Sequence, residues 1–223
     1  MIKINENVYT YDYDFKMGGG VYFPARCIIV KNNTELTLIS PGPFHEAVFN
    51  QIHTLGEVKH IIAPNCFHHA YINTALRHFP QAQLYMPYTL NKKYPGKFLA
   101  EYENLLDQSQ VSNLLLKQVS GHKVLSETVF FEPNSKTLIL TDLIFNIEKT
   151  KNLISNIFFS LLTLKGKPKL SPLIKFTVKD KAVFFDDLRE ILNLDFETIV
   201  MAHGTPISSD AKATLQSAWG IDL

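Results

Sequence analysis

The chain has 223 residues, of which 46% are hydrophobic and 19% are charged, with 22 basic and 21 acidic side chains. This composition supplies enough apolar material for a sizeable core and excludes a disordered chain. The formal charge of +1 lacks the basic excess that displaces phosphate counterions, so we expect no nucleic-acid partner. The length favours a single domain over residues 1–223.

The compartment follows from three features of the sequence. Cys27 and Cys66 lie far apart, which is typical of two reduced thiols in a reducing compartment. Residues 1–7 lack the charged and then apolar pattern of a secretory signal. The most apolar stretch, 153–164, is interrupted by polar residues and is shorter than the roughly 20 apolar residues that span a bilayer. We therefore expect a cytoplasmic protein without a transmembrane segment.

The hydrophobic pattern, taken in chain order, predicts strands, then alternating helices and strands, then strands again. Strands are expected at 8–13, 21–23, 27–30, 36–39, 58–62, 83–86, 115–119, 127–131, 137–141 and 198–202. Helices are expected at 45–55, 69–78, 154–162, 187–194 and 209–219, with shorter helical pieces inside 87–110. Ser208 or Ser209 is the expected N-cap of the last helix. This order predicts an α+β sandwich.

Metal-binding side chains follow three of the predicted buried strands. His68 and His69 come after strand 58–62, Asp142 after strand 137–141, and His203 after strand 198–202. Because strand ends converge on one edge of a sheet, these side chains can share a site although they are distant in sequence. Imidazole and carboxylate groups together suit zinc or iron, with water at an open position. For each residue taken alone, a structural hydrogen-bonding role is the alternative.

Four short motifs occur in a characteristic order. They are Pro64-Asn65 with His68-His69, Gly121-His122, the segment 137–143, and His203-Gly204. In this order and spacing, the chain resembles a diverged branch of the metallo-β-lactamase-like superfamily, closest to a domain-of-unknown-function family of about this length. The resemblance runs from Arg26 to Trp219. It implies an αββα sandwich with the site at one edge of the two sheets.

The metal motifs are degenerate. The superfamily loop has the form His-x-His-x-Asp-His, and here Asn65 and Phe67 stand near its first two histidines. Phe67 cannot bind a metal, and Asn65 is a poor zinc ligand. His68 aligns with the aspartate that accepts a proton in active members, and Ser40 stands where an aspartate is common. The resemblance therefore implies His68 as the catalytic proton acceptor or an additional ligand, and as metal ligands His69, Asp142, His203 and His122.

These residues would hold at most one divalent ion, such as zinc, iron or manganese, and a second ion would lack ligands. The resemblance thus implies a metal-dependent hydrolase of an unknown small-molecule substrate, which could be an ester, thioester, amide or phosphoester. The alternative is a non-catalytic binding or scaffold protein that keeps the sandwich fold without a functional metal centre.

Three further features have more than one interpretation. Cys66 and His68 could form a nucleophilic pair, although a buried thiol is the simpler account. Glu127 and Glu132 could supply a carboxylate to the site, and we expect them to be exposed strand charges instead. The apolar stripe at 154–162 is expected to pack across the sandwich. If that stripe is exposed, it predicts a homodimer, or contact with a membrane surface.

Overall fold

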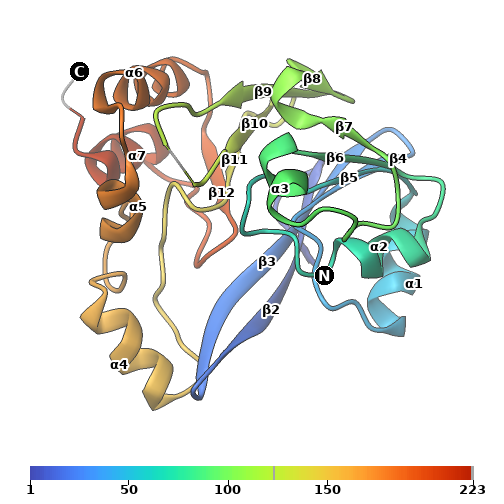
Figure 1. The fold of residues 1–223 in the computed structure, drawn as a ribbon, viewed down its shortest axis with the longest axis horizontal. Coiled ribbons are helices and arrows are strands. Elements are labelled where there is room, and N and C mark those ends of the chain that lie inside the picture. The colour runs from blue at the N-terminus through green and yellow to red at the C-terminus, as the bar shows by residue number, and fades with distance from the viewer. Residues whose placement is uncertain (123, 222–223) are drawn as a thin grey trace.

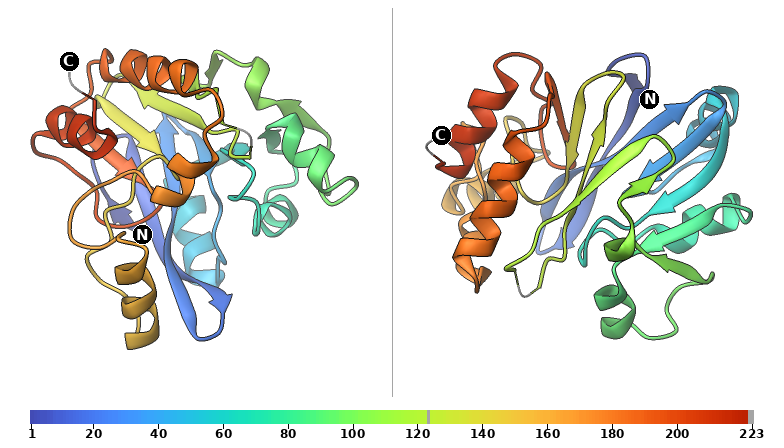
Figure 2. Two further views of the ribbon diagram at one scale, coloured as in Figure 1. Left: turned by 60° about the vertical axis from the view of Figure 1, so that its left-hand side comes forward. Right: turned by 90° about the horizontal axis from the view of Figure 1, so that it is seen from above.

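The computed structural model describes residues 1–122 and 124–221. In this part of the chain two β-sheets lie face to face, and helices cover both outer faces (Figures 1 and 2). The right-hand view of Figure 2 shows the four layers in the order helix, sheet, sheet, helix. This is the αββα sandwich that the sequence predicts.

The first sheet has seven strands that follow one another in chain order from one edge to the other. They are β1 (Ile2–Lys3), β2 (Val8–Gly18), β3 (Val21–Asn32), β4 (Glu35–Ile39), β5 (Glu57–Ile62), β6 (Gln83–Met86) and β7 (Tyr102–Asn104). The first four strands are antiparallel, and β4 to β7 are parallel. The parallel strands are joined through α1 (Glu46–Leu55), α2 (Ile72–His78) and α3 (Tyr88–Lys93).

The second sheet has five strands in the order β12-β11-β10-β9-β8. They are β8 (Gln110–Val111), β9 (Leu114–Gln118), β10 (Thr128–Glu132), β11 (Thr137–Leu140) and β12 (Thr198–Met201). Only β11 and β12 pair in parallel among these described strands. The remaining helices are η1 (Leu105–Asp107), α4 (Leu153–Leu161), α5 (Pro172–Thr177), α6 (Lys181–Leu192) and α7 (Ala211–Trp219).

Strand β3 shows how the layers are held together. Ile28 and Val30 belong to the core between the two sheets, whereas Cys27 and Ile29 belong to the core under α1 and α2. Side chains alternate between the two faces of a strand, so a strand that is apolar at every position is buried on both faces. Cys27 and Cys66 are free and buried, as the sequence indicates.

Several predicted elements differ from the structure. The helix expected at 187–194 is α6 and begins at Lys181, and the strands expected at 21–23 and 27–30 are parts of the single strand β3. Residues 102–104 were expected to be helical, and they form the edge strand β7 because pairing with β6 outweighs the local helical spacing. Helix α7 begins after Asp210, which has a positive φ of 48°, and not after Ser208 or Ser209. Helix α5 was not predicted because its six residues are too few for a clear period.

The expectation that the 154–162 stripe packs across the sandwich is wrong. On α4, Ile154 and Ile157 are each 51% exposed and Leu161 is 78% exposed. The buried side chains of this helix are Ser155 and Phe159. The Ser155 hydroxyl accepts a hydrogen bond of 2.9 Å from the Tyr22 amide in β3, which turns that face of the helix inward. Among the described residues, no helix is long and apolar enough to cross a bilayer.

A buried arginine joins the two sheets. The guanidinium of Arg26 in β3 makes two hydrogen bonds of 2.7 Å to the Asp12 carboxylate. It also donates to the carbonyl oxygens of Met201 and Gly204, at 2.9 and 2.6 Å, beside the end of β12. Arg26 is only 6% exposed, so these bonds are largely shielded from water. The residue holds the end of β12 against the first sheet.

We expect Arg26→Met to lower the free energy of unfolding by about 2–3 kcal/mol, because the buried carbonyl of Met201 and the part-buried carbonyl of Gly204 lose this donor. Urea denaturation measures this change. Arg189→Met is the matched control, since Arg189 makes an exposed ion pair with Asp186 and its loss should cost less than about 1 kcal/mol. Equal effects of the two substitutions would contradict the role assigned to Arg26.

Gly204, directly after His203, has a φ of +105° that strains any other residue. A Cβ atom there would lie 2.0 Å from the carbonyl oxygen of Asn146. We expect Gly204→Ala to destabilise the fold by about 3 kcal/mol or more, as measured by thermal or urea denaturation. Gly166→Ala is the control, because Gly166 has a similar φ of +94° in open space, and about 1–2 kcal/mol is expected there. Similar losses at both positions would refute the close approach.

Candidate metal centre

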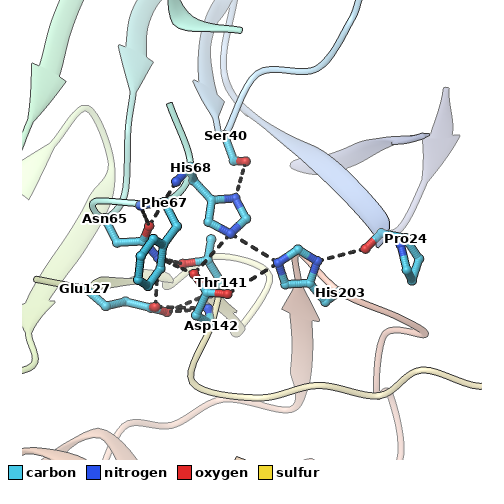
Figure 3. Close-up of polar contacts among 9 residues, drawn as sticks. All are labelled: Pro24, Ser40, Asn65, Phe67, His68, Glu127, Thr141, Asp142 and His203. Carbon is cyan, nitrogen blue, oxygen red and sulfur yellow. Dashed lines mark hydrogen bonds and ion pairs between the residues drawn. The ribbon is translucent and has the colours of Figure 1, made fainter. Parts of the chain in front are cut away.

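Strand register brings three metal-binding side chains to one edge of the sandwich. In the parallel pair, Leu140 of β11 lies opposite Met201 of β12, so two residues further on Asp142 and His203 leave adjacent strands at equivalent positions. His68 arrives from the other sheet, in the loop after β5 (Figure 3). The predicted convergence of strand ends is therefore present for these three residues.

The three side chains are in contact. His68 Nε2 lies 3.2 Å from Asp142 Oδ2, and His203 Nε2 lies 3.4 Å from Asp142 Oδ1. The two Nε2 atoms are 3.2 Å apart. Within the described residues, these form the one group of three or more potential ligands whose donor atoms all lie within 4.8 Å of one another.

These separations fit a single small cation. Zinc ligands lie about 2.0–2.1 Å from the ion, so the edges of a zinc tetrahedron are roughly 3.3 Å long. The 3.2 Å between the two Nε2 atoms matches such an edge, and each Nε2 lies 3.2–3.4 Å from a different oxygen of Asp142. With one ligand atom from each residue, the three atoms all lie within 4.8 Å of one another. One imidazole pair and one carboxylate also form a donor set that zinc, iron and manganese accept. The residues present therefore fit one divalent ion.

The outer hydrogen bonds prepare the imidazoles for this role. His203 Nδ1 lies 2.8 Å from the carbonyl oxygen of Pro24, which can only accept, so Nδ1 carries the proton. In neutral His203 the lone pair is then on Nε2, facing His68 and Asp142. This lone pair and those of the Asp142 carboxylate repel one another unless a proton or a metal ion lies between them. His68 Nδ1 is held by the Ser40 hydroxyl at 2.7 Å.

A buried polar network fixes the carboxylate. The Asn65 amide nitrogen donates to Asp142 Oδ2 at 2.7 Å and also contacts Glu127 and Thr141 at 3.1 and 3.0 Å. The Asn65 oxygen accepts the amides of residues 67 and 68, which shapes the loop after β5. Asn65 is fully buried and its amide is engaged on both sides, so it supports the centre without offering a ligand atom.

The expectation that Glu127 and Glu132 are exposed strand charges is wrong. Both are fully buried. Glu127 accepts the backbone amides of Thr141 and Asp142, at 2.7 and 2.9 Å, and so orients the segment that carries Asp142. Glu132 instead accepts the amides of Asn134 and Ser135 in the turn before β11. Backbone amides replace the water that each carboxylate loses on burial.

The charges of the cluster are strongly interdependent. Burial alone would raise the pKa of Asp142, but His68 and His203 hold it below its ordinary value. Burial lowers the pKa of His203, whereas Asp142 outweighs burial at His68 and raises its pKa. Burial and then the charge of Asp142 raise the pKa of Glu127 to about 7. Asp142 is thus the stable negative charge of this centre.

Two predicted ligands lie elsewhere. His69 is outside the cluster: its Nδ1 accepts a 2.9 Å hydrogen bond from Lys97, and burial together with Lys97 lowers its pKa to about 4. His122 Nδ1 accepts the amides of residues 124 and 125, and its Nε2 faces the carbonyl of Ile174 and the hydroxyl of Thr177. Both nitrogens of His122 are therefore engaged. The adjacent His68, expected as the proton acceptor, takes the place among the donors that was assigned to His69.

The cluster lies at a cavity of about 430 Å³. Most of its lining is apolar and includes Phe15, Phe23, Phe145, Phe158, Leu162 and Leu173. The polar lining groups include His68, Asp142, His203, His122 and Ser40. No lysine or arginine is among the described residues that line it. The cavity thus offers one polar centre in apolar surroundings.

The sequence analysis missed the supporting roles of Glu127, Arg26 and Pro24. For Glu127 a signal was available: in the β10–β11 hairpin Phe130 lies opposite Ile139, and extending that register by three residues puts Glu127 opposite Asp142. This position opposite a candidate ligand distinguishes Glu127 from a glutamate at the edge of a sheet, and it indicates a role in the site. The other two act from a different sheet, which no local pattern reveals.

Comparison with known proteins agrees with this architecture. A family model described as a domain of unknown function (DUF4336) matches residues 5–182. A search of curated proteins finds no match.

Among solved structures, the chain is similar to the DIM-1 metallo-beta-lactamase exposed to ceftazidime, with a TM-score of 0.67 and 12% identity over 97% of this chain and 94% of that one. It is similar to a metallo-beta-lactamase from Pontibacter korlensis, with a TM-score of 0.65 and 14% identity over 97% and 96%. It is also similar to the mono-zinc form of FIM-1 from Pseudomonas aeruginosa, with a TM-score of 0.66 and 12% identity over 97% and 92%.

Identities this low show a shared fold, and the family match covers most of the chain. The chain therefore belongs to the DUF4336 domain family and has the metallo-β-lactamase-like sandwich in a sequence that has diverged from those enzymes.

Proposed function

We propose that the protein is a hydrolase that uses one divalent metal ion to cleave a small uncharged ester, thioester or amide with an apolar substituent. The observation that carries this proposal is the donor set of His68, Asp142 and His203 at the apolar cavity, in which each Nε2 lies 3.2–3.4 Å from an Asp142 oxygen and the two Nε2 atoms are 3.2 Å apart. An ion bound there would polarise the substrate carbonyl and activate water for attack at neutral pH.

The protein's own residues would divide the remaining tasks. Ser40, Pro24 and Asn65 hold the three ligand side chains in place through hydrogen bonds. The aromatic and aliphatic walls exclude bulk water and orient the apolar substituent toward the ligands. No lysine or arginine is among the described lining residues, which argues against a phosphoester, whose negative charge would find no permanent side-chain cation there beside the ion.

The reaction should be slow for an enzyme of this fold. His68 is the group that could accept a proton, and in this proposal its Nε2 is committed to the ion. His122 also lines the cavity, but both of its nitrogens are occupied by hydrogen bonds. A positioned acid or base usually contributes 10²- to 10⁴-fold to a rate. We expect the rate to be reduced by about this factor relative to a site with a free base.

A second candidate function is ligand binding without catalysis. It is favoured by the contacts of Asn65 and Phe67, which stand in the loop after β5 where the resemblance implies two histidine ligands. Asn65 is tied into the hydrogen-bond network, and the side chain of Phe67 lines the cavity while the residue is 47% exposed. Neither supplies a ligand, and the apolar cavity could bind a small molecule whether or not a metal is present.

Metal binding separates the two functions at the first step. We expect the purified protein to bind about one equivalent of zinc, or of cobalt with a tetrahedral absorption spectrum, because three ligands converge. Alanine at His68, Asp142 or His203 should weaken binding by at least about 100-fold, as measured by calorimetry. Alanine at His69 or His122 should leave the affinity within about threefold, since neither joins the cluster. Loss of metal in the His69→Ala variant alone would overturn the assigned ligand set.

Hydrolysis of p-nitrophenyl esters tests the substrate class. We expect kcat/KM to rise from acetate to butyrate by about tenfold, since each buried methylene contributes about 0.8 kcal/mol. Leu162→Ala, at the cavity wall, should reduce this dependence on chain length. Leu153→Ala is its control, because Leu153 is the first residue of α4, whose C-cap is Leu162, and is 71% exposed. A preference for phosphodiesters would reject the class, and metal binding without hydrolysis of any ester would favour the ligand-binding function.

A further inference from the structure

An exposed apolar face lies beside the cavity. It is formed by α4 and α5, and we call it the α4–α5 face. Its members are Leu153, Ile154, Ile157, Leu161, Leu173 and Phe176, which are 51–90% exposed. Phe176 is the most exposed, at 90%. Isolated exposed apolar residues are ordinary, but a group of this size on two successive helices indicates a contact surface.

The charge of this segment is strongly one-sided. Residues 150–178 contain five lysines and no arginine, aspartate or glutamate. The whole chain has a formal charge of +1, so the rest of the protein carries a charge of −4. Exposed members of the lysine set include Lys167 and Lys175. Apolar side chains interspersed with lysines, without acidic residues, are the composition of a surface that binds anionic lipid.

The cavity opens next to the same face. Leu173 both lines the cavity and is 59% exposed, and Met17 at the end of β2 does the same at 51%. Phe158 and Leu162, on the inner side of the α4 region, form part of the cavity wall. Figure 1 shows α4 and α5 one after the other along one side of the molecule, with the tip of the β2–β3 hairpin beside α4.

We propose that the α4–α5 face docks on an anionic lipid bilayer, with the apolar side chains entering the headgroup region and the lysines contacting lipid phosphates and carboxylates. Docking would place the mouth of the cavity at the bilayer surface. A ligand with an apolar chain could then move from the lipid into the cavity without exposing that chain to water. This inference goes beyond the proposed hydrolysis and does not require it.

Charge favours lipid over a second copy of the chain. A symmetric dimer through this face would bring together two segments that each carry five lysines and no acidic residue. Such like charges repel, whereas an anionic bilayer attracts them. The two helices that carry the face, α4 and α5, lie at the periphery of the molecule (Figure 1). Homodimer formation is therefore treated as a competing outcome of the test.

The experiment measures flotation of the purified full chain with lipid vesicles. We expect binding to phosphatidylcholine vesicles that contain about 30% phosphatidylserine, and at least about tenfold weaker binding to pure phosphatidylcholine. Salt at about 0.5 M should weaken the binding, because screening shortens the reach of the lysines. In Phe176→Trp, the fluorescence emission should shift to the blue when anionic vesicles are added, while the buried Trp219 reports no insertion.

Matched variants locate the contact. Leu161→Ser with Phe176→Ser should reduce flotation by at least about tenfold, and both positions are exposed enough to leave folding unchanged. Leu99→Ser with Leu115→Ser is the control pair, since these residues are 60% and 43% exposed on other elements.

Charge reversal tests the electrostatic part in the same assay. Lys175→Glu should weaken binding by about tenfold, whereas Lys92→Glu on α3 should not. Three results would overturn the proposal: no binding to anionic vesicles, equal binding by the serine pair and the wild type, or a dimer in analytical ultracentrifugation that the serine pair abolishes. Because none of these readouts depends on metal or on ester cleavage, their failure is distinct from failure of the proposed hydrolysis.

Discussion

The Asp142 carboxylate, buried between two imidazoles, is the constraint on which the rest of the site depends. A buried negative charge must be matched by polar partners, and here His68, His203 and Asn65 provide them. Each partner is fixed in turn, His68 by Ser40 and His203 by the carbonyl of a residue in β3. The result is a donor set whose ligand atoms, one from each residue, all lie within 4.8 Å of one another and could hold one small ion.

The sandwich supplies this arrangement because two sheets contribute to one edge. Asp142 and His203 are brought together by the parallel pairing of β11 and β12, and His68 comes from the sheet opposite. Arg26 holds the end of β12 against the first sheet, so the distance between the two halves of the centre depends on a buried side chain that touches no ligand. Binding of an ion at this centre would therefore be coupled to fold stability.

Two positions in the loop after β5 determine the character of the cavity without offering a ligand. Asn65 is part of the support of Asp142, and Phe67 is part of the cavity lining. With no lysine or arginine among the described lining residues, the polar centre is surrounded by apolar walls. An apolar cavity beside a lysine-rich apolar face is consistent with a ligand that partitions into lipid, which links the two proposals through one physical property.

The sequence by itself determined the sandwich, most strand and helix positions, and two members of the three-residue cluster, Asp142 and His203, because local periodicity and strand ends are short-range properties. The register of the β10–β11 hairpin would also have placed Glu127 beside Asp142. Tertiary structure alone decided between His68 and His69. In the loop after β5, the side chain of His68 contacts Asp142, whereas the side chain of His69 contacts Lys97. It also decided which face of α4 is buried and how Arg26 joins the sheets. The buried face of α4 and the contacts of Arg26 both depend on segments more than 100 residues apart in the sequence, which local patterns cannot encode.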